Sequence, residues 1–209
     1  MEKLNIYLQD VEKIWFTSDP HFSHANIMKF CDRPFESVKD MDEALIRNWN
    51  ECVTDNDIAF ILGDFCWNKT PGNLMKILNQ LNGKHIYIIP GNHDKPEAFA
   101  QIDGPWENLS RFSLLDDIVH VYIRCNIGDP RSLELILSHY PLMTWSGRHR
   151  GSINLHGHVH SKPGQINESF DGNLPYWKGY QLDVGVDRHN YKPIDLQQVL
   201  VELEKQKEP

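Results

Sequence analysis

The chain has 209 residues, of which 40% are hydrophobic and 24% are charged, a composition typical of globular proteins and not of disordered ones. This length predicts a single domain over residues 1–209, with a core large enough to need no disulfides. The formal net charge of −8 argues against a protein that binds along a nucleic-acid backbone, because that function requires a basic face.

The N-terminal sequence MEKLNIYLQDVEKIW has no apolar segment of the kind found in signal peptides. No run approaches the roughly 20 apolar residues that span a bilayer. We therefore expect a cytoplasmic protein without a membrane partner. The four cysteines are widely spaced and form no CxxC pair, which predicts reduced, structural thiols: Cys31, Cys52, Cys66 and Cys125.

The first half of the chain alternates between predicted strands and helices. Short apolar runs rich in β-branched and aromatic residues predict strands over 13–19, 57–64 and 84–94. Between them, apolar residues at helical spacing predict helices over 37–53 and 70–83. This β-α-β-α-β order indicates parallel strands with crossover helices.

The second half predicts strands over 117–125, 133–139, 152–158 and 180–187, joined mostly by loops. An amphipathic closing helix is predicted over 195–206. The fold class is therefore mixed α/β, with either one mixed sheet or two packed sheets and outer helices.

Five of the predicted strands end in residues that can bind a metal. The last of them, INLHGHVH, places His156, His158 and His160 at alternate positions, which on extended backbone point to one face. Ligands of open α/β sheets bind beyond the carboxyl ends of the strands. The candidate donors at these ends are Asp19, His21, Asp64, Asn92, His139, His158 and His160.

Each strand end also has an ordinary explanation when it is considered alone. Asp19 is suited to a turn or a helix N-cap, and GNHD consists mainly of turn residues. Together, however, seven donors are too many for one small cation and suit two cations that share a carboxylate. A set of oxygen and nitrogen donors without thiolate favours Mn, Fe, Zn, Co or Ni over a structural zinc site.

The motifs DPH, GD, GNHD, SH and GHVH, in this order over residues 19–160, resemble those of the calcineurin-like metallophosphoesterase superfamily. The resemblance implies a four-layer α-β-β-α sandwich of two mixed β-sheets flanked by helices. It also implies a dinuclear metal site at the strand ends, with two divalent metal ions, of which Mn is our first expectation.

The resemblance also implies the role of each donor. One metal ion is held by Asp19, His21, Asp64 and His160. The other is held by Asp64, Asn92, His139 and His158, so that Asp64 bridges the two ions. A hydroxide bridging the ions attacks phosphorus, and His93 protonates the leaving oxygen as general acid. His156 is not a ligand of the family, and we expect it in packing or in support of a ligand.

The substrate is less well defined by the sequence. GDFCWNKT departs from the Asp-Arg-Gly signature of the protein Ser/Thr phosphatases and diadenosine-polyphosphate hydrolases, and the chain is similar instead to compact bacterial and phage phosphoesterases. Trp67 and Trp145 are candidates for stacking on a base. Candidate substrate-binding residues are His24, Arg33, Arg148 and His149.

We therefore expect a phosphodiesterase whose partner is a small phosphate ester, with nucleotides among the candidates and no long nucleic acid. A phosphomonoesterase with the same dinuclear site is the alternative. A non-catalytic scaffold of the same fold is disfavoured, because His93 and all seven ligand positions are present.

Overall fold

The protein, described here from a computed structural model, is built on two five-stranded β-sheets. The structure describes residues 1–102, 111–126, 130–163 and 180–207. The strands of sheet I are β2 (Ile14–Thr17), β3 (Ile58–Leu62), β4 (His85–Ile89), β5 (Phe112–Leu114) and β10 (Ile194–Asp195). The strands of sheet II are β1 (Glu2–Tyr7), β6 (Ile118–Arg124), β7 (Leu133–Ser138), β8 (Ile153–His156) and β9 (Gln181–Asp183).

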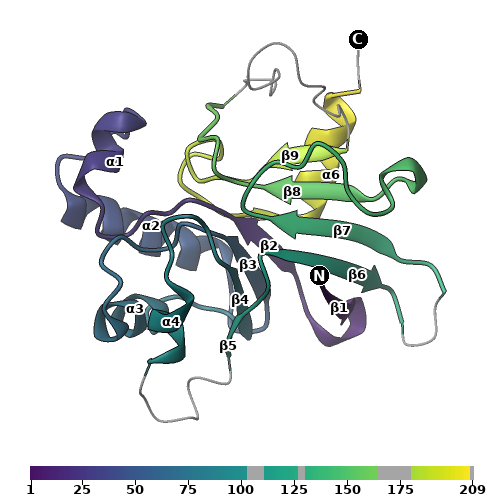
Figure 1. The fold of residues 1–209 in the computed structure, drawn as a ribbon, viewed down its shortest axis with the longest axis horizontal. Helices are drawn as coiled ribbons and strands as arrows, with labels where there is room; N and C mark the ends of the chain where they lie inside the picture. The colour runs from purple at the N-terminus through teal and green to yellow at the C-terminus, as the bar shows by residue number, and fades with distance from the viewer. Residues whose placement is uncertain (103–110, 127–129, 164–179, 208–209) are drawn as a thin grey trace.

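Sheet I has the order β10-β2-β3-β4-β5 and is parallel except at β10, which runs antiparallel to β2. Parallel neighbours require crossover connections, and helices supply them. α2 (Val38–Cys52) lies between β2 and β3, and α3 (Pro71–Leu78) lies between β3 and β4. α1 (Ala25–Phe30) and α4 (Pro96–Ala100) lie on the same side of the sheet (Figure 1).

Sheet II has the order β1-β6-β7-β8-β9 and is mixed, with an antiparallel pair only between β6 and β7. α6 (Leu196–Lys205) contacts β2, β9 and β10, so it packs where the two sheets meet. Its buried residues Val199 and Leu203 belong to the core between the sheets. Two single-turn 3-10 helices, η1 (Leu8–Asp10) and η2 (Arg148–Arg150), lie in connections.

Both faces of sheet I are buried, which explains why its strands are continuously apolar. Successive side chains of a strand point to opposite faces. Phe16 and Phe60 therefore enter the core between the sheets, where their rings stack with centroids 5.6 Å apart. Trp15 and Ile61 enter the second core, beneath the helices.

The predicted fold class is confirmed: the chain is mixed α/β, with two mixed sheets flanked by helices. The parallel arrangement predicted for the first half is also confirmed for β2, β3 and β4. Three strands were not predicted from the sequence: β1, β5 and β10. The last two have three residues and two residues, too few to carry a pattern, and β1 buries only Ile6. In the described residues, no helix is long and apolar enough to cross a membrane.

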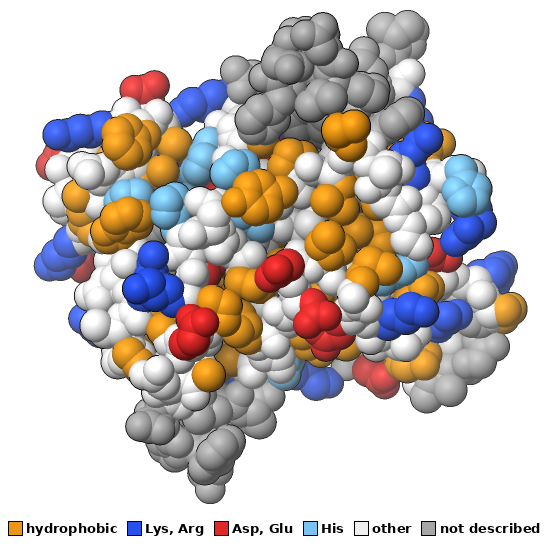
Figure 2. All heavy atoms as spheres, in the orientation of Figure 1, with side chains coloured by type: hydrophobic (Ala, Val, Ile, Leu, Met, Phe, Trp, Pro, Cys, Tyr) orange, Lys and Arg blue, Asp and Glu red, His pale blue; other side chains and the backbone are white. Residues whose placement is uncertain are grey.

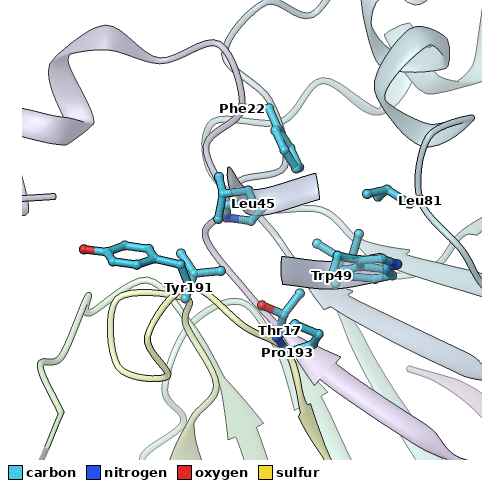
Figure 3. Close-up of a pocket in the computed structure, with 10 residues that line it drawn as sticks. Thr17, Phe22, Leu45, Trp49, Leu81, Tyr191 and Pro193 are labelled. Atoms are coloured by element: carbon cyan, nitrogen blue, oxygen red, sulfur yellow. The ribbon is translucent and has the colours of Figure 1, made fainter. Parts of the chain in front are cut away.

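A cavity of about 20 Å³ lies in the second core, between α2 and sheet I (Figure 3). Leu45 and Trp49 line it from the helix side, and Thr17 lines it from β2. The Thr17 hydroxyl is buried without a hydrogen-bond partner among the described residues. A buried water needs two to four polar partners, and the mainly apolar lining of this cavity offers few of them.

This unpaired hydroxyl predicts that Thr17→Val stabilises the protein. Valine has the shape of threonine, and the substitution removes a buried polar group whose hydrogen bonds to water were lost on folding. We expect the free energy of unfolding to rise by about 1 kcal/mol. Urea unfolding of the two proteins measures the change, and a loss of stability of similar size would show that the hydroxyl has a partner.

Candidate metal centre

The loops that follow five strands bring the predicted donors together. β2, β3 and β4 end in sheet I, and β7 and β8 end in sheet II. Histidine side chains gather on this face of the molecule, with hydrophobic side chains on both sides of them (Figure 2). The side chains that the loops deliver are Asp19, His21, Asp64, Asn92, His139, His158 and His160.

The first group of donors consists of Asp19, His21 and His160, whose ligand atoms all lie within 4.8 Å of one another. Asp19 Oδ1 lies 4.0 Å from His21 Nε2 and 3.7 Å from His160 Nε2. Asp19 Oδ1 and His21 Nε2 are buried and have no hydrogen-bond partner within the described chain. Unpaired buried donors and acceptors are costly, and a cation between them would satisfy both.

The second group consists of Asp64, His139 and His158, again with ligand atoms within 4.8 Å of one another. The Asn92 side-chain oxygen lies 2.9 Å from His139 Nε2 and adds an oxygen donor to this group. Asp64 Oδ2 lies 3.5 Å from His139 Nε2 and 3.4 Å from His21 Nε2. The Asp64 carboxylate therefore faces both groups, so the arrangement fits two cations that share it.

The imidazole tautomers also fit metal binding. His139 Nδ1 lies 2.8 Å from the carbonyl oxygen of Leu62, which can only accept, so Nδ1 carries the hydrogen. His160 Nδ1 lies 2.7 Å from a carboxylate oxygen of Asp187 and likewise donates. In the neutral form of both rings, Nε2 then carries the lone pair and faces the acidic side chains, which is the form that binds a metal.

The backbone at the centre is strained. Five of the seven donors have a positive φ, between 48° and 70°, a region that residues other than glycine seldom adopt: Asp19, His21, Asp64, His158 and His160. Each such residue costs on the order of 1–3 kcal/mol, and strain of this kind concentrates at functional sites. The folded structure offsets this cost in order to hold five donors in place.

Two glycines allow the loops to approach one another. A side chain at Gly157 would collide with Ser18 Oγ and with the Asp19 carboxylate. A side chain at Gly91 would collide with Asp64 Oδ1. With glycine at position 157, the His158 backbone N–H donates to Asp19 Oδ2 over 2.9 Å, which joins a loop of sheet II to a loop of sheet I.

Burial shifts the pKa values of several donors in the centre. Burial raises the pKa of Asp19 to about 6, and burial lowers the pKa of His21 and of His158. Burial would also lower the pKa of His160, but its interactions with Asp187, Cys31 and Asp19 together outweigh burial and raise the pKa to about 10. A metal ion must therefore displace a proton from His160 near neutral pH, and from Asp19 as well below about pH 6.

His93 lies beside the donors. Its backbone N–H donates to Asp64 Oδ1 over 2.8 Å, and its ring centroid lies 5.5 Å from that of His21. Asp94, its nearest acidic neighbour in sequence, accepts from the backbone N–H groups of Phe65 and Gly91. Asp94 therefore fastens the loop that carries Asn92 and His93 to the end of β3.

His24 is part of the site, in contact with a predicted ligand. Its Nδ1 lies 3.3 Å from Nδ1 of His21, so it holds the outer nitrogen of that ring. The His24 ring also stacks on Trp67, with centroids 4.1 Å apart and an interplanar angle of 9°. Trp67 is 46% exposed and its ring centroid lies 5.4 Å from that of His93, so it borders the centre on the solvent side.

The structure corrects the prediction that Arg33 binds the substrate phosphate. The Arg33 side chain is completely buried. Its Nε and Nη2 donate to both carboxylate oxygens of Asp187, and its Nη1 donates to the carbonyl of Pro20. The guanidinium is therefore used within the protein and is not accessible to a phosphate.

Arg148 and His149 are a second correction, because the structure does not bring them to the centre. They lie in η2, before β8 begins, whereas His158 follows the opposite end of β8. Gly147, just before them, packs against Glu134 at the beginning of β7.

Trp145 is also buried, with its indole N–H donating to the carbonyl of Ser152, so it offers no stacking surface.

His156 lies inside β8, where it is buried, and its Nδ1 lies 3.0 Å from the carbonyl oxygen of Gly157. It points neither to Asp19 nor to Asp64 in any contact within the described residues. Of the three alternating histidines, the last two therefore serve the centre and the first belongs to the strand.

Three residues of the site were not predicted from the sequence. Asp183 and Asp187 come at and after the end of β9, and strand-end carboxylates were the signal that could have found them. Asp183 accepts from the backbone and side chain of Ser161, next to His160. Tyr140, 49% exposed, packs on the His158 ring with centroids 4.5 Å apart, and its position directly after His139 was the available signal.

The two donor groups are of a kind that can hold divalent metal ions. A family model described as calcineurin-like phosphoesterase matches residues 12–189, and the chain belongs to this family. The superfamily resemblance noted from the motifs is thereby confirmed. The family acts on phosphoester bonds as a hydrolase.

The relatives extend over nearly the whole chain. The "Uncharacterized protein MJ1445" of Methanocaldococcus jannaschii is 33% identical over 200 residues, which cover 94% of each chain. The "Gene 66 protein" of Mycobacterium phage D29 is 30% identical over 200 residues, 88% of this chain and 94% of the phage protein. A solved structure of a protein of unknown function, AQ665 from Aquifex aeolicus, has a TM-score of 0.62 at 22% identity, over 90% of this chain and 97% of that one.

The shifted pKa values predict that metal binding releases protons and weakens in acid. A metal ion binds only the deprotonated donors. Because the pKa of Asp19 is raised to about 6, protons compete for this carboxylate at a higher pH than for an ordinary aspartate, and metal affinity falls as the pH falls through about 6.

Calorimetric titration of the metal-free protein with Mn²⁺, in buffers of different ionisation enthalpy, measures both effects. We expect net proton release near neutral pH, because His160 has a raised pKa. Affinity that is the same on both sides of pH 6, without proton release, would contradict the assignment of Asp19 and His160 as ligands.

Proposed function

We propose that the protein is a dinuclear metal-dependent phosphodiesterase that acts on small phosphate diesters, with nucleotides as candidate substrates. The observation that carries this proposal is the position of the Asp64 carboxylate. Its Oδ2 lies 3.4 Å from His21 Nε2 and 3.5 Å from His139 Nε2, between the two donor groups. A shared carboxylate is what a pair of adjacent cations requires.

The two donor groups would hold one ion each. Asp19, His21 and His160 would bind the first, and Asn92, His139 and His158 would bind the second, with Asp64 common to both. When bound, two divalent ions supply an acidified water as nucleophile and neutralise charge on the phosphoryl oxygens. Mn is our first candidate among the metals that suit oxygen and imidazole donors.

His93 would donate the proton that the leaving group requires. As the water oxygen bonds to phosphorus and the ester P–O bond breaks, the departing oxygen needs a proton, and a positioned imidazole supplies it. The hydrogen bond from the His93 backbone N–H to Asp64 Oδ1 ties this residue to the centre. Its ring also contacts Trp67, which limits where it can turn.

The exposed aromatic side chains favour a diester over a monoester. Trp67 lies beside His24 and His93 at one side of the centre, and Tyr140 lies beside His139 and His158 at the other. Both are about half exposed. A phosphodiester carries an organic group on each side of phosphorus, and two flanking aromatic rings suit planar groups such as nucleobases.

A phosphomonoesterase with the same metal centre is the alternative, since the donors would serve either reaction. A scaffold role is less suited to this chain, because five donors are held on strained backbone. The acidic net charge of −8 is consistent with a small substrate and with the absence of a long nucleic-acid partner.

The direct test is hydrolysis of bis-p-nitrophenyl phosphate beside p-nitrophenyl phosphate, with metal-stripped protein and with added Mn²⁺. The proposal predicts cleavage of the diester that depends on the metal. Cleavage of the monoester alone would favour the phosphatase alternative, and no cleavage of either by protein carrying two metal ions would contradict the proposed function.

His93→Ala is expected to lower kcat by about 100-fold or more for a diester with an alkoxide leaving group, because such a group needs the proton and general acid catalysis is worth that much. Metal content should stay near that of the wild type, since the ring is not one of the seven donors. His85→Ala is the matched control, because His85 lies on β4 and pairs with Ser113 on β5. Loss of metal from the His93 variant, or full activity, would refute its role as general acid.

Trp67→Ala and Tyr140→Ala are expected to raise KM for an aromatic diester by about tenfold, because stacking is worth ~1–3 kcal/mol per ring. Neither should change KM for dimethyl phosphate or a similar aliphatic diester. Phe30→Ala, at an exposed aromatic residue of α1, serves as the control. Equal effects on both classes of diester would show that these rings do not select planar groups.

A further inference from the structure

The histidines of the centre differ in what holds their outer nitrogen. His139 Nδ1 donates to the backbone carbonyl of Leu62, and His21 Nδ1 contacts His24. His160 Nδ1 instead donates to the carboxylate of Asp187 over 2.7 Å. A carboxylate behind a metal-binding imidazole fixes its tautomer and orientation and increases the basicity of the other nitrogen. This support should increase the metal affinity of the first donor group relative to the second.

Asp187 is in turn held by Arg33. The guanidinium donates to both carboxylate oxygens, from Nε over 2.9 Å and from Nη2 over 2.8 Å. Both side chains are completely buried. A bidentate pair of this kind has a defined geometry. Because both charges are buried, removing either side chain would leave the other as an uncompensated buried charge.

Arg33 also binds the loop that carries the other donors of the first group. Its Nη2 donates to the carbonyl oxygen of Asp19 over 2.7 Å, and its Nη1 donates to that of Pro20 over 2.9 Å. Pro20 lies between Asp19 and His21, so these bonds fix the backbone from which both donors extend. One guanidinium thus joins the loop after β2 to the carboxylate that orients His160, after β8.

The second donor group has no such connection to Arg33 in the described contacts. His139 is oriented by the carbonyl of Leu62, the last residue of β3, two residues before Asp64. The relative position of Asp64 and His139 therefore depends on the hydrogen bond between His139 and the end of β3. The relative position of Asp19 and His160 depends in addition on the chain of contacts through Arg33 and Asp187.

We propose that Arg33 and Asp187 are positioning residues that set the affinity of the first donor group for its metal ion and leave the second group unaffected. The proposal rests on the dinuclear centre proposed above and adds that its two sites are unequal. Cys31 also offers its thiol within 4.8 Å of ligand atoms of His160 and Asp187. Both oxygens of Asp187 already bind Arg33, so this third group is better explained as support than as another metal site.

The charges explain why the pair matters for a cation. Asp187 strengthens the donor nitrogen of His160, while Arg33 balances the buried negative charge of Asp187. In Asp187→Asn the amide oxygen can still accept from His160, but the guanidinium remains buried and unbalanced next to the Asp19 loop. An uncompensated positive charge there opposes the binding of a metal ion.

The experiment is a titration of the metal-free, full-length protein with Mn²⁺, followed by calorimetry and by electron paramagnetic resonance. The wild type is expected to bind two ions and to show the spectrum of a coupled pair. Asp187→Asn is expected to weaken one site by about 10–100-fold and to leave the other unchanged. With two equivalents of Mn²⁺, at a concentration that fills both wild-type sites but not the weakened one, the variant should therefore show a mononuclear spectrum.

Two further variants make the result specific. Arg33→Lys keeps the charge but loses the planar fork, so it should weaken the same site, by a smaller factor. Asp57→Asn is the matched control, because Asp57 is a buried carboxylate that accepts from Trp15 and Thr54 far from the donors. It should lower stability without changing the binding of either ion. If Asp187→Asn does not fold, the Arg33→Lys result decides.

Folded variants that bind both ions with wild-type affinity would overturn the proposal, and so would equal weakening of both sites. A wild-type protein that binds fewer than two ions would give a different failure, since it would contradict the dinuclear function itself. Weakening of one site in both Arg33→Lys and Asp187→Asn, with no change in Asp57→Asn, is the result that the proposal predicts.

Discussion

Two carboxylates are buried where the loops of the two sheets meet, and the metal centre is built around them. Asp19 and Asp64 are almost completely removed from water. A buried charge is costly unless it is paired and hydrogen-bonded, and Asp19 Oδ1 has no hydrogen-bond partner within the described residues. Imidazole nitrogens surround both carboxylates at 3.4–4.0 Å. Cations between these groups would offset the cost of burying them.

The fold supplies this arrangement by bringing strand ends from both sheets to one edge. Parallel strands with helical crossovers place Asp19, Asp64 and Asn92 after consecutive strands of sheet I. The strand pair β7 and β8 places the remaining histidines opposite them. The close approach of the loops requires glycine at position 157 and positive φ at five donors, so local strain accompanies the site. Packing of the two cores holds the strand ends and makes this strain tolerable.

Much of this could be predicted from the sequence, because strands and donors are both local patterns. Continuous apolar runs marked the strands of sheet I, and the residue after each run marked the edge of the sheet. Contacts between distant segments could not be predicted in this way. Arg33 and Asp187 lie 154 residues apart, and nothing near either one indicates the pair. Without it, Arg33 was misinterpreted as a phosphate ligand.

Closeness in sequence gave a second wrong prediction. Arg148 and His149 precede His158 by about one short strand, and that strand carries them to the opposite end of the sheet. Trp145 was also wrongly predicted to stack on a base, since its indole is buried and donates a hydrogen bond to Ser152. Tyr140 shows the reverse case, because it follows a donor directly and stays at the site. Side-chain position relative to the strand, and not distance along the chain, decides which residues reach the centre.

A crystal structure of the protein with Mn²⁺, with the ions located by anomalous scattering, would show directly whether the centre is dinuclear. We expect two ions at the strand ends, one contacting His21 and His160 and the other contacting His139 and His158, with the Asp64 carboxylate between them. A single ion, or ions bound away from Asp64, would contradict this expectation.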